Sequence, residues 1–240
     1  MSSVVQFSSA VEFLGDAANK DLSLTGVSAG NSILVPVSLA VFTSAEPTIT
    51  VSDGTSYTND IEVWLNPASE RKKVAIFRLH NVSAGSKTIT VSFSGPGFAN
   101  VYGAMRAYEV SGLANAAPDK TMSATGTSDT PATSASGTLT QTDNFVLGAL
   151  MAQFGGIDLP TGFTNLYLDN STAAVPPNSH DYDNVSSTSS VTISWGTLAA
   201  SSEWAAVGAV YKDAAVGQPA VIRGRGVPGM TARSLFGRGW

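Results

Sequence analysis

The pattern in this sequence closest to a catalytic motif is Gly26-Val27-Ser28-Ala29-Gly30, which matches G-x-S-x-G. Such a pattern can hold a nucleophilic serine on a sharp turn between a strand and a helix. Here the next residues, 31–42, have the pattern of a strand, and Val-Ser-Ala-Gly recurs at 82–85, again directly before a strand. We therefore interpret both copies as turns and do not expect Ser28 to act as a nucleophile.

Histidine and cysteine chemistry is sparse. The chain has two histidines, His80 and His180, and no cysteine, which excludes disulfides, thiol catalysis and cysteine-bound zinc. We expect His80 on the outward side of a strand end and His180 in a loop over 178–183. Neither a histidine metal site nor a Ser-His-Asp triad is predicted from this spacing.

Carboxylates offer two further chemistries. Segments 53–60 and 181–184 carry oxygen ligands of the kind that Ca²⁺ takes, but neither matches an EF-hand loop, and solvated turns explain both. A glycosidase would need paired carboxylates. Glu62, Glu109 and Glu203 lie in or beside expected strands without visible pairing, and Glu109 is expected to be a solvated charge at a strand end. We predict no catalytic residue, no metal, no cofactor and no enzymatic activity.

Aromatic side chains outside the core would be needed to bind a carbohydrate. Trp64, Trp195 and Trp204 fall within expected strands and are assigned to the core. The better candidates for contacting a surface glycan are tyrosines nearer to loops: Tyr57, Tyr167 and Tyr182.

The elements that would position these residues have strand patterns. Alternating apolar and polar side chains, typical of half-buried strands, occur in three segments: 47–52, 87–94 and 190–196. Segments that are apolar on both faces predict central strands covered on both sides: 33–42, 145–152 and 204–210. Further strands are expected at 61–65, 74–80, 98–110, 136–141 and 162–168.

No stretch shows the 3.6-residue periodicity of a capped helix. Short strands separated by turn residues such as Asp53-Gly54 are typical of antiparallel sandwiches. We therefore predict an all-β fold, an antiparallel β-sandwich of jelly-roll or Ig-like type. Residues 115–137 are polar and rich in Ser and Thr. We expect them to form a long surface connection, an edge hairpin or a seam between two halves of the sandwich.

Charge divides the 240 residues into two parts. Lys and Arg number 13 and Asp and Glu 18, and only 13% of residues are charged, about half of the usual fraction. All of the acids lie within residues 1–213, the predicted body, whereas residues 214–240 contain four arginines and no acid. A general nucleic-acid surface is not expected at this balance. No apolar run reaches the ~18 residues of a membrane span.

Residues 214–240, which we call the C-terminal arm, contain Gly and Pro too often for a helix or a long strand. They nevertheless keep bulky apolar side chains, in which disordered tails are poor. We predict an extended arm that places apolar anchors in pockets and arginines on the acidic surface of its own body or a neighbouring subunit. The expected partner-binding residues are Ile222, Arg223, Arg225, Arg233, Leu235, Phe236, Arg238 and Trp240.

Segments 102–112, 145–149 and 204–211 resemble strands of sandwich domains in structural proteins of tailed bacteriophages. The similarity covers residues 20–213, and the C-terminal arm is similar to the anchoring arms of such proteins. The resemblance implies a virion structural protein, made in the host cytoplasm, that decorates or cements a capsid. It implies binding to major capsid or tail subunits and to copies of itself, without nucleic-acid or membrane partners. The alternative is a tail or fibre module, or a carbohydrate-binding module for host attachment.

Overall fold

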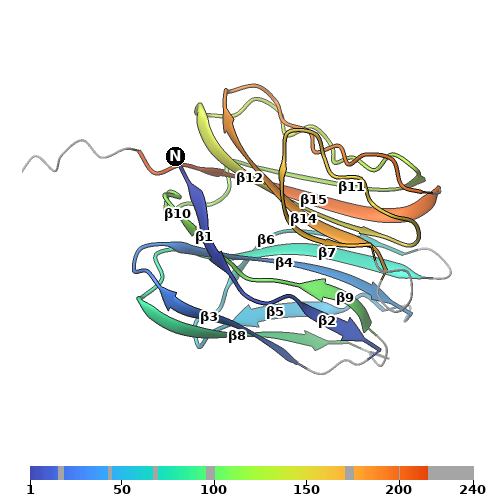
Figure 1. Cartoon of the computed structure of the whole chain (residues 1–240), viewed down its shortest axis with the longest axis horizontal. Helices are drawn as coiled ribbons and strands as arrows, with labels where there is room; N and C mark the ends of the chain where they lie inside the picture. The colour runs from blue at the N-terminus through green and yellow to red at the C-terminus, as the bar shows by residue number, and fades with distance from the viewer. Residues whose placement is uncertain are drawn as a thin grey trace, which may run out of the picture.

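The alternating and apolar segments of the sequence fold into antiparallel sheets (Figure 1). The computed structural model describes residues 1–15, 19–42, 45–66, 70–95, 101–170, 176–199 and 201–215. These residues contain strands and no helix, and therefore no helix long and apolar enough to cross a membrane. The predicted all-β antiparallel fold is confirmed. Its assignment to a jelly-roll or Ig-like type stays a prediction.

The middle layer is a seven-stranded sheet built around β4. Every residue of β4 is buried. β4 pairs with β7 along one side and with both β10 and β9 along the other. The N-terminal strands β1 and β2 pair with β10 and β9 and form that edge of the sheet. The strands are β1 (Ser3–Phe7), β10 (Tyr108–Ser111), β4 (Ser32–Val41), β7 (Arg71–Leu79) and β6 (Thr58–Leu65), with β2 (Val11–Leu14) and β9 (Val101–Met105) beside them.

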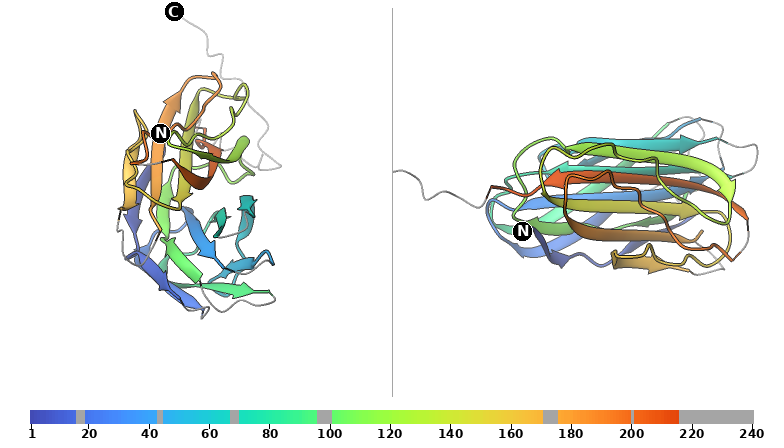
Figure 2. Two further views of the ribbon diagram at one scale, coloured as in Figure 1. Left: turned by 90° about the vertical axis from the view of Figure 1, so that its right-hand side faces the viewer. Right: turned by 90° about the horizontal axis from the view of Figure 1, so that it is seen from above.

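Two smaller sheets flank this middle layer (Figure 2). The three-stranded sheet has the order β3 (Lys20–Val27), β8 (Gly85–Ser94) and β5 (Thr48–Ser52). The five-stranded sheet has the order β11 (Lys120–Ser128), β15 (Ser202–Lys212), β12 (Asp143–Ala152), β14 (Asn178–Ser186) and β13 (Thr164–Asp169).

Apolar side chains fill the space between these layers. One core lies between the seven-stranded and three-stranded sheets, and a second lies between the seven-stranded and five-stranded sheets. A third core covers the outer face of β12 and β15 and includes Leu139, Ile193 and Trp195. Strands β4, β12 and β15 therefore contribute side chains to a core on both of their faces, which confirms the prediction of central strands at 33–42, 145–152 and 204–210.

The third core is closed by extended chain rather than by strands. Segments 136–141 and 190–196 were predicted as strands but do not form a regular ladder. The backbone N–H of Ser136 donates to the Val191 carbonyl at 2.8 Å, and that of Thr133 donates to the Ile193 carbonyl at 2.9 Å. The alternation predicted for 190–196 still holds, because Ile193 and Trp195 are buried.

Other boundaries also differ from the predictions. The polar segment 115–137 contains an edge strand, β11, which pairs with β15 instead of forming a hairpin with its neighbour. The single strand expected at 98–110 is two strands, β9 and β10, separated by Arg106 and Ala107. At the break, the hydroxyl of Ser8 accepts a hydrogen bond from the backbone N–H of Ala107 at 3.0 Å.

Gly103 in β9 allows the middle sheet to pack closely. Its φ is +145°, and a Cβ at this position would lie 2.0 Å from the backbone oxygen of Ser38 in β4. The backbone approach between these strands leaves no room for a side chain.

Candidate functional site

The two Val-Ser-Ala-Gly segments are turns, as predicted. The first connects β3 to β4, and the second leads directly into β8. They lie side by side, because the N–H of Gly30 donates to the Val82 carbonyl at 2.9 Å and the N–H of Val82 donates to the Asn31 carbonyl at 3.0 Å. Ser28 is exposed, and a strand follows it. The helix that a nucleophile elbow requires is therefore missing after this serine.

Glu109 in β10 is fully buried, so the prediction of a solvated charge at this position is wrong. Its carboxylate accepts hydrogen bonds from Ser28 N–H at 2.8 Å, Asn31 Nδ2 at 2.6 Å and Gln6 Nε2 at 2.5 Å. A buried carboxylate needs such donors to replace water. Glu109 thus connects β10 to Gln6 in β1 and to the turn after β3.

His180 lies within β14, so the predicted loop over 178–183 is also wrong. Its ring is fully buried, and its Nδ1 lies 3.0 Å from the Tyr108 hydroxyl. Burial lowers the pKa of His180 to about 3. Ser179, His180 and Asp181 are consecutive strand residues and alternate between the two faces of the sheet. They cannot form a catalytic triad with one another, because the histidine points away from the other two.

Asp181 holds the cover of the third core in place. Its carboxylate accepts from the Trp195 indole N–H at 2.9 Å, the Ser179 hydroxyl at 2.8 Å and Asn165 Nδ2 at 2.9 Å. Burial raises the pKa of Asp181, while these three donors favour its ionised form. The carboxylate therefore has a structural role, connecting β14 to β13 and to the extended segment that contains Trp195.

The remaining predicted polar candidates are also engaged within the protein. The ring nitrogens of His80 contact the Ser32 hydroxyl at 2.6 Å and the Ala116 carbonyl at 2.8 Å, so this half-buried histidine is not free at an outward surface. Glu203 lies 3.6 Å from Nζ of Lys72, whose side chain is fully buried. Desolvation by burial lowers the pKa of Lys72.

The segments considered for Ca²⁺ use their carboxylates in internal contacts. Asp53 accepts a hydrogen bond from Thr55 N–H at 3.2 Å and lies 3.7 Å from Lys87 Nζ. Asp60 forms an ion pair with Arg78 and accepts from the Tyr211 hydroxyl at 2.8 Å. Across the part of the chain that the structure describes, no cluster of three His, Cys, Asp or Glu residues could hold a metal ion.

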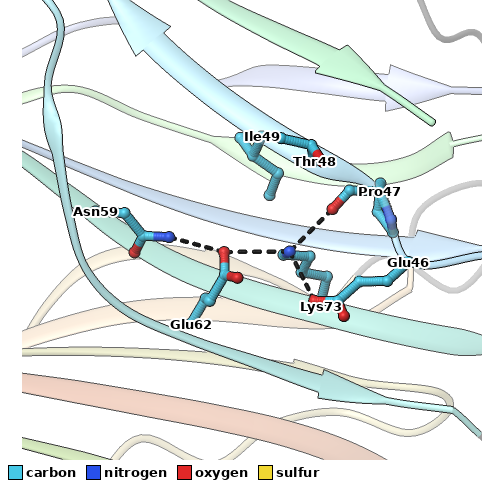
Figure 3. Close-up of a pocket in the computed structure, with 7 residues that line it drawn as sticks. All are labelled: Glu46, Pro47, Thr48, Ile49, Asn59, Glu62 and Lys73. Carbon is cyan, nitrogen blue, oxygen red and sulfur yellow. Dashed lines mark hydrogen bonds and ion pairs between the residues drawn. The ribbon is translucent and has the colours of Figure 1, made fainter.

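A polar pocket opens where β5 and β6 diverge into different sheets (Figure 3). Its volume is about 310 Å³. At its base Lys73 from β7 is nearly buried, with its Nζ 2.8 Å from Glu46 Oε1, 3.1 Å from Glu62 Oε2 and 2.9 Å from the Pro47 carbonyl. Asn59 Nδ2 donates to Glu62 at 2.7 Å. The ammonium thus bridges the edge strands of two sheets.

The pocket is suited to hydrogen bonding rather than to proton transfer. The three acceptors around Lys73 match the three N–H donors of an ammonium group, so none is left for a substrate. The side chains of Glu46 and Glu62 are 45% and 39% exposed, and both are engaged by the same ammonium. Their outer oxygens can accept hydrogen bonds from ligand hydroxyls. The sequence indicated Glu62 as a candidate carboxylate but not that it shares the Lys73 ammonium with Glu46. That arrangement depends on the divergence of β5 from β6.

A second surface is the edge formed by residues 3–14, which we call the N-terminal edge. It contains no Lys, Arg or Pro and a single acid, Glu12. Val5 and Phe7 are each 51% exposed, and Leu14 is 58% exposed. Arg106 packs on the Phe7 ring with its guanidinium carbon 4.0 Å from the ring centroid. An edge strand without charge or proline is unusual, because such edges invite pairing with other chains.

The aromatic predictions are confirmed only for the tryptophans. Trp195 and Trp204 are buried, and Trp64 is partly buried against the first core. Tyr57 is buried, so its assignment to the surface is wrong. Tyr182 is half-buried and stacks on Phe145. Half-buried Tyr167 directs its hydroxyl toward Glu12 at 3.4 Å. Among the residues that the structure describes, the aromatic side chains that are more than half exposed are Phe7, Phe42 and Phe154.

The predicted partner-binding residues of the C-terminal arm lie outside the described residues: Ile222, Arg223, Arg225, Arg233, Leu235, Phe236, Arg238 and Trp240. The described chain ends with Ala214 and Ala215, and the N–H of Ala214 donates to the Gly112 carbonyl at 2.6 Å.

No family model, curated protein or solved structure matches this chain.

Proposed function

We propose that this chain is a non-enzymatic structural protein of a tailed-bacteriophage virion, made in the host cytoplasm, that decorates or cements the capsid. It binds major capsid or tail subunits and copies of itself, with the C-terminal arm as the main contact. In this proposal residues 1–213 form the body, a sandwich of jelly-roll or Ig-like type, and residues 214–240 form the arm.

The observation that best supports an assembly role is the N-terminal edge. Strand β1 exposes Val5 and Phe7 at this edge and contains no charged residue or proline of its own, which is a liability for a protein that works alone. The same edge is an advantage for a protein that works inside an assembly, where another chain covers it. The internal use of Glu109, Asp181 and His180 also fits this role, since these groups stabilise the body instead of facing a cleft.

Sedimentation of the full chain and of a chain ending at Ala215 tests the proposal. The shorter chain keeps the hydrogen bond from Ala214 to Gly112 and every described strand. We expect the full chain to form oligomers and the shorter chain to be a folded monomer. Folded monomers in both cases, together with no binding to capsid or tail subunits, would contradict the proposal.

The pocket around Lys73 favours a second candidate function, binding of a surface glycan by a tail, fibre or carbohydrate-binding module. Exposed carboxylates beside an amide are suited to neighbouring hydroxyl groups of a sugar. A glycan array followed by calorimetry tests this function, using Glu62→Gln as the pocket variant and Asp129→Asn as a control at an exposed site elsewhere. Failure of every arrayed glycan to bind, or equal binding by the Glu62 variant, would reject it.

A further inference from the structure

The position and charge of the N-terminal edge indicate which segment of a neighbouring chain binds it. We infer that residues 3–14 form the docking site for the C-terminal arm of a neighbouring copy, part of which adds to the sheet as a short extra strand. This inference rests on the proposed function, because it takes the arm as the segment that joins copies. It adds the surface on which the arm is received and the mode of recognition, which is pairing of backbone groups along a strand edge.

The edge has backbone groups available for pairing. Within the described residues β1 pairs with β10 alone, and β2 pairs with β9 alone. The β1 ladder shifts register between Val4 and Gln6, which leaves Val5 as the extra residue of a bulge. Val5 and Phe7, beside these backbone groups, each have about half of their surface exposed. A strand added here would cover both side chains.

The edge is also held in a fixed shape before anything binds. The backbone N–H of Ser2 donates to Asp213 at 2.9 Å, and Gln6 is bonded to Glu109 at 2.5 Å. Arg106 donates to the Ser8 carbonyl at 2.7 Å. Because these contacts order the receiving strand in advance, only the arm loses conformational freedom on docking.

The arm begins beside this edge and is long enough to reach a neighbour. The carboxylate of Asp213 accepts a hydrogen bond from Ser2 N–H, and the next residue, Ala214, donates its N–H to the Gly112 carbonyl. Residues 216–240 number 25, and at about 3.3 Å per residue an extended chain of this length spans roughly 80 Å. By the same rise the N-terminal edge is roughly 40 Å long. The arm can therefore cross to a second body and still place a short strand along its edge.

Charge favours the arm over a second copy of the same edge. The arm contains four arginines and no acid, whereas the body contains all 18 acids and nine basic residues. Pairing two N-terminal edges would bring together two acidic bodies, in which each edge has the carboxylate of Glu12 and the guanidinium that Arg106 packs on Phe7. The arm would instead bring arginines to that carboxylate. It also contains Val221 and Ile222, whose branched side chains favour strands and can cover Val5 and Phe7.

Titration of a body of residues 1–215 into a peptide of residues 216–240 tests the inference. The signal is the anisotropy of a fluorescent dye attached to the peptide, because the body itself contains Trp64, Trp195 and Trp204. The edge variant is Val5→Lys, which adds a positive charge where the arm would lie. The matched control is Thr125→Lys, at an exposed position of β11, the edge strand of the five-stranded sheet. We expect Val5→Lys to weaken binding at least tenfold and Thr125→Lys to change it less than twofold.

Amide hydrogen exchange gives a measurement that needs no variant. Peptide binding should slow exchange within residues 3–14 and leave β11 unchanged. If the full chain assembles through its arm but neither Val5→Lys nor exchange at the edge responds, the inference is wrong and the proposed function stands. If the peptide does not bind and the full chain is monomeric without capsid or tail partners, both fail.

Discussion

Glu109 gives the sharpest test of the structure, because three donors converge on one buried carboxylate. In Glu109→Ala the N–H of Ser28 and the side-chain amides of Asn31 and Gln6 lose their acceptor. A hydrogen bond to a charged group contributes about 1.5–3 kcal/mol. Ser28 is exposed and the other two donors are half-buried, so water partly replaces the carboxylate. We expect the free energy of unfolding to fall by about 3–5 kcal/mol.

Glu109→Gln separates the hydrogen bonds from the charge. The amide oxygen of the new side chain can accept from Ser28 and Asn31, while its NH₂ group faces Gln6. A rotation of the Gln6 amide then presents an oxygen to that NH₂ group, and all three bonds are kept. The variant loses only the charge of the acceptor, so we expect a decrease of about 1–2 kcal/mol.

Urea unfolding followed by circular dichroism measures both variants, with Glu12→Gln as a control at an exposed site. The control should stay within about 0.5 kcal/mol of the parent chain. A loss below about 1 kcal/mol for Glu109→Ala, or equal losses for the Ala and Gln variants, would refute the assignment of Glu109 as a buried acceptor of three bonds.

Three further predictions concern other parts of the body. Gly103→Ala should lower the free energy of unfolding by about 3 kcal/mol or more, because the new Cβ meets the backbone of β4. Gly137→Ala has open space around it and should lower the free energy of unfolding by only about 1–2 kcal/mol in the same experiment. Because burial lowers the pKa of His180 to about 3, the unfolded state binds its proton first. As the pH is lowered from 6.5 to 3, the free energy of unfolding should therefore fall by up to about 1.4 kcal/mol per pH unit. A His180→Gln chain whose stability has the same pH slope would disprove this. Trp195→Phe removes a donor at 2.9 Å from Asp181 and should lower the unfolding midpoint by the equivalent of about 1–3 kcal/mol, while an unchanged midpoint would argue against that bond.

Sequence patterns were sufficient to predict the strands that pack against a core on both faces. β4 and β12 are mostly apolar on both faces, and such composition is typical of a strand covered on both sides. β14 was missed because its first residues, Asn-Ser-His-Asp, are typical of a loop, and their burial depends on partners far along the chain. His180 and Asp181 in this strand bond to Tyr108 and Trp195, which no local pattern brings to them.

The candidate surfaces were harder to predict for the same reason. Glu46, Glu62 and Lys73 are brought together only because two sheets diverge at their edges. The N-terminal edge exists because β1 and β2 lie at the border of a sheet rather than within it, and the sequence does not give this position. Period-two alternation shows which residues face a core, but it does not show which strand lies at an edge.

The position of β15 has a consequence for how the chain reaches its folded state during synthesis. β15 is the last strand described, and it lies between β11 and β12 in the five-stranded sheet. A growing chain that has not yet produced residues 202–212 leaves β11 without its pairing partner and one edge of β12 open. The five-stranded sheet can therefore close only when the body is almost complete, so that nearly the whole chain leaves the ribosome before this layer folds.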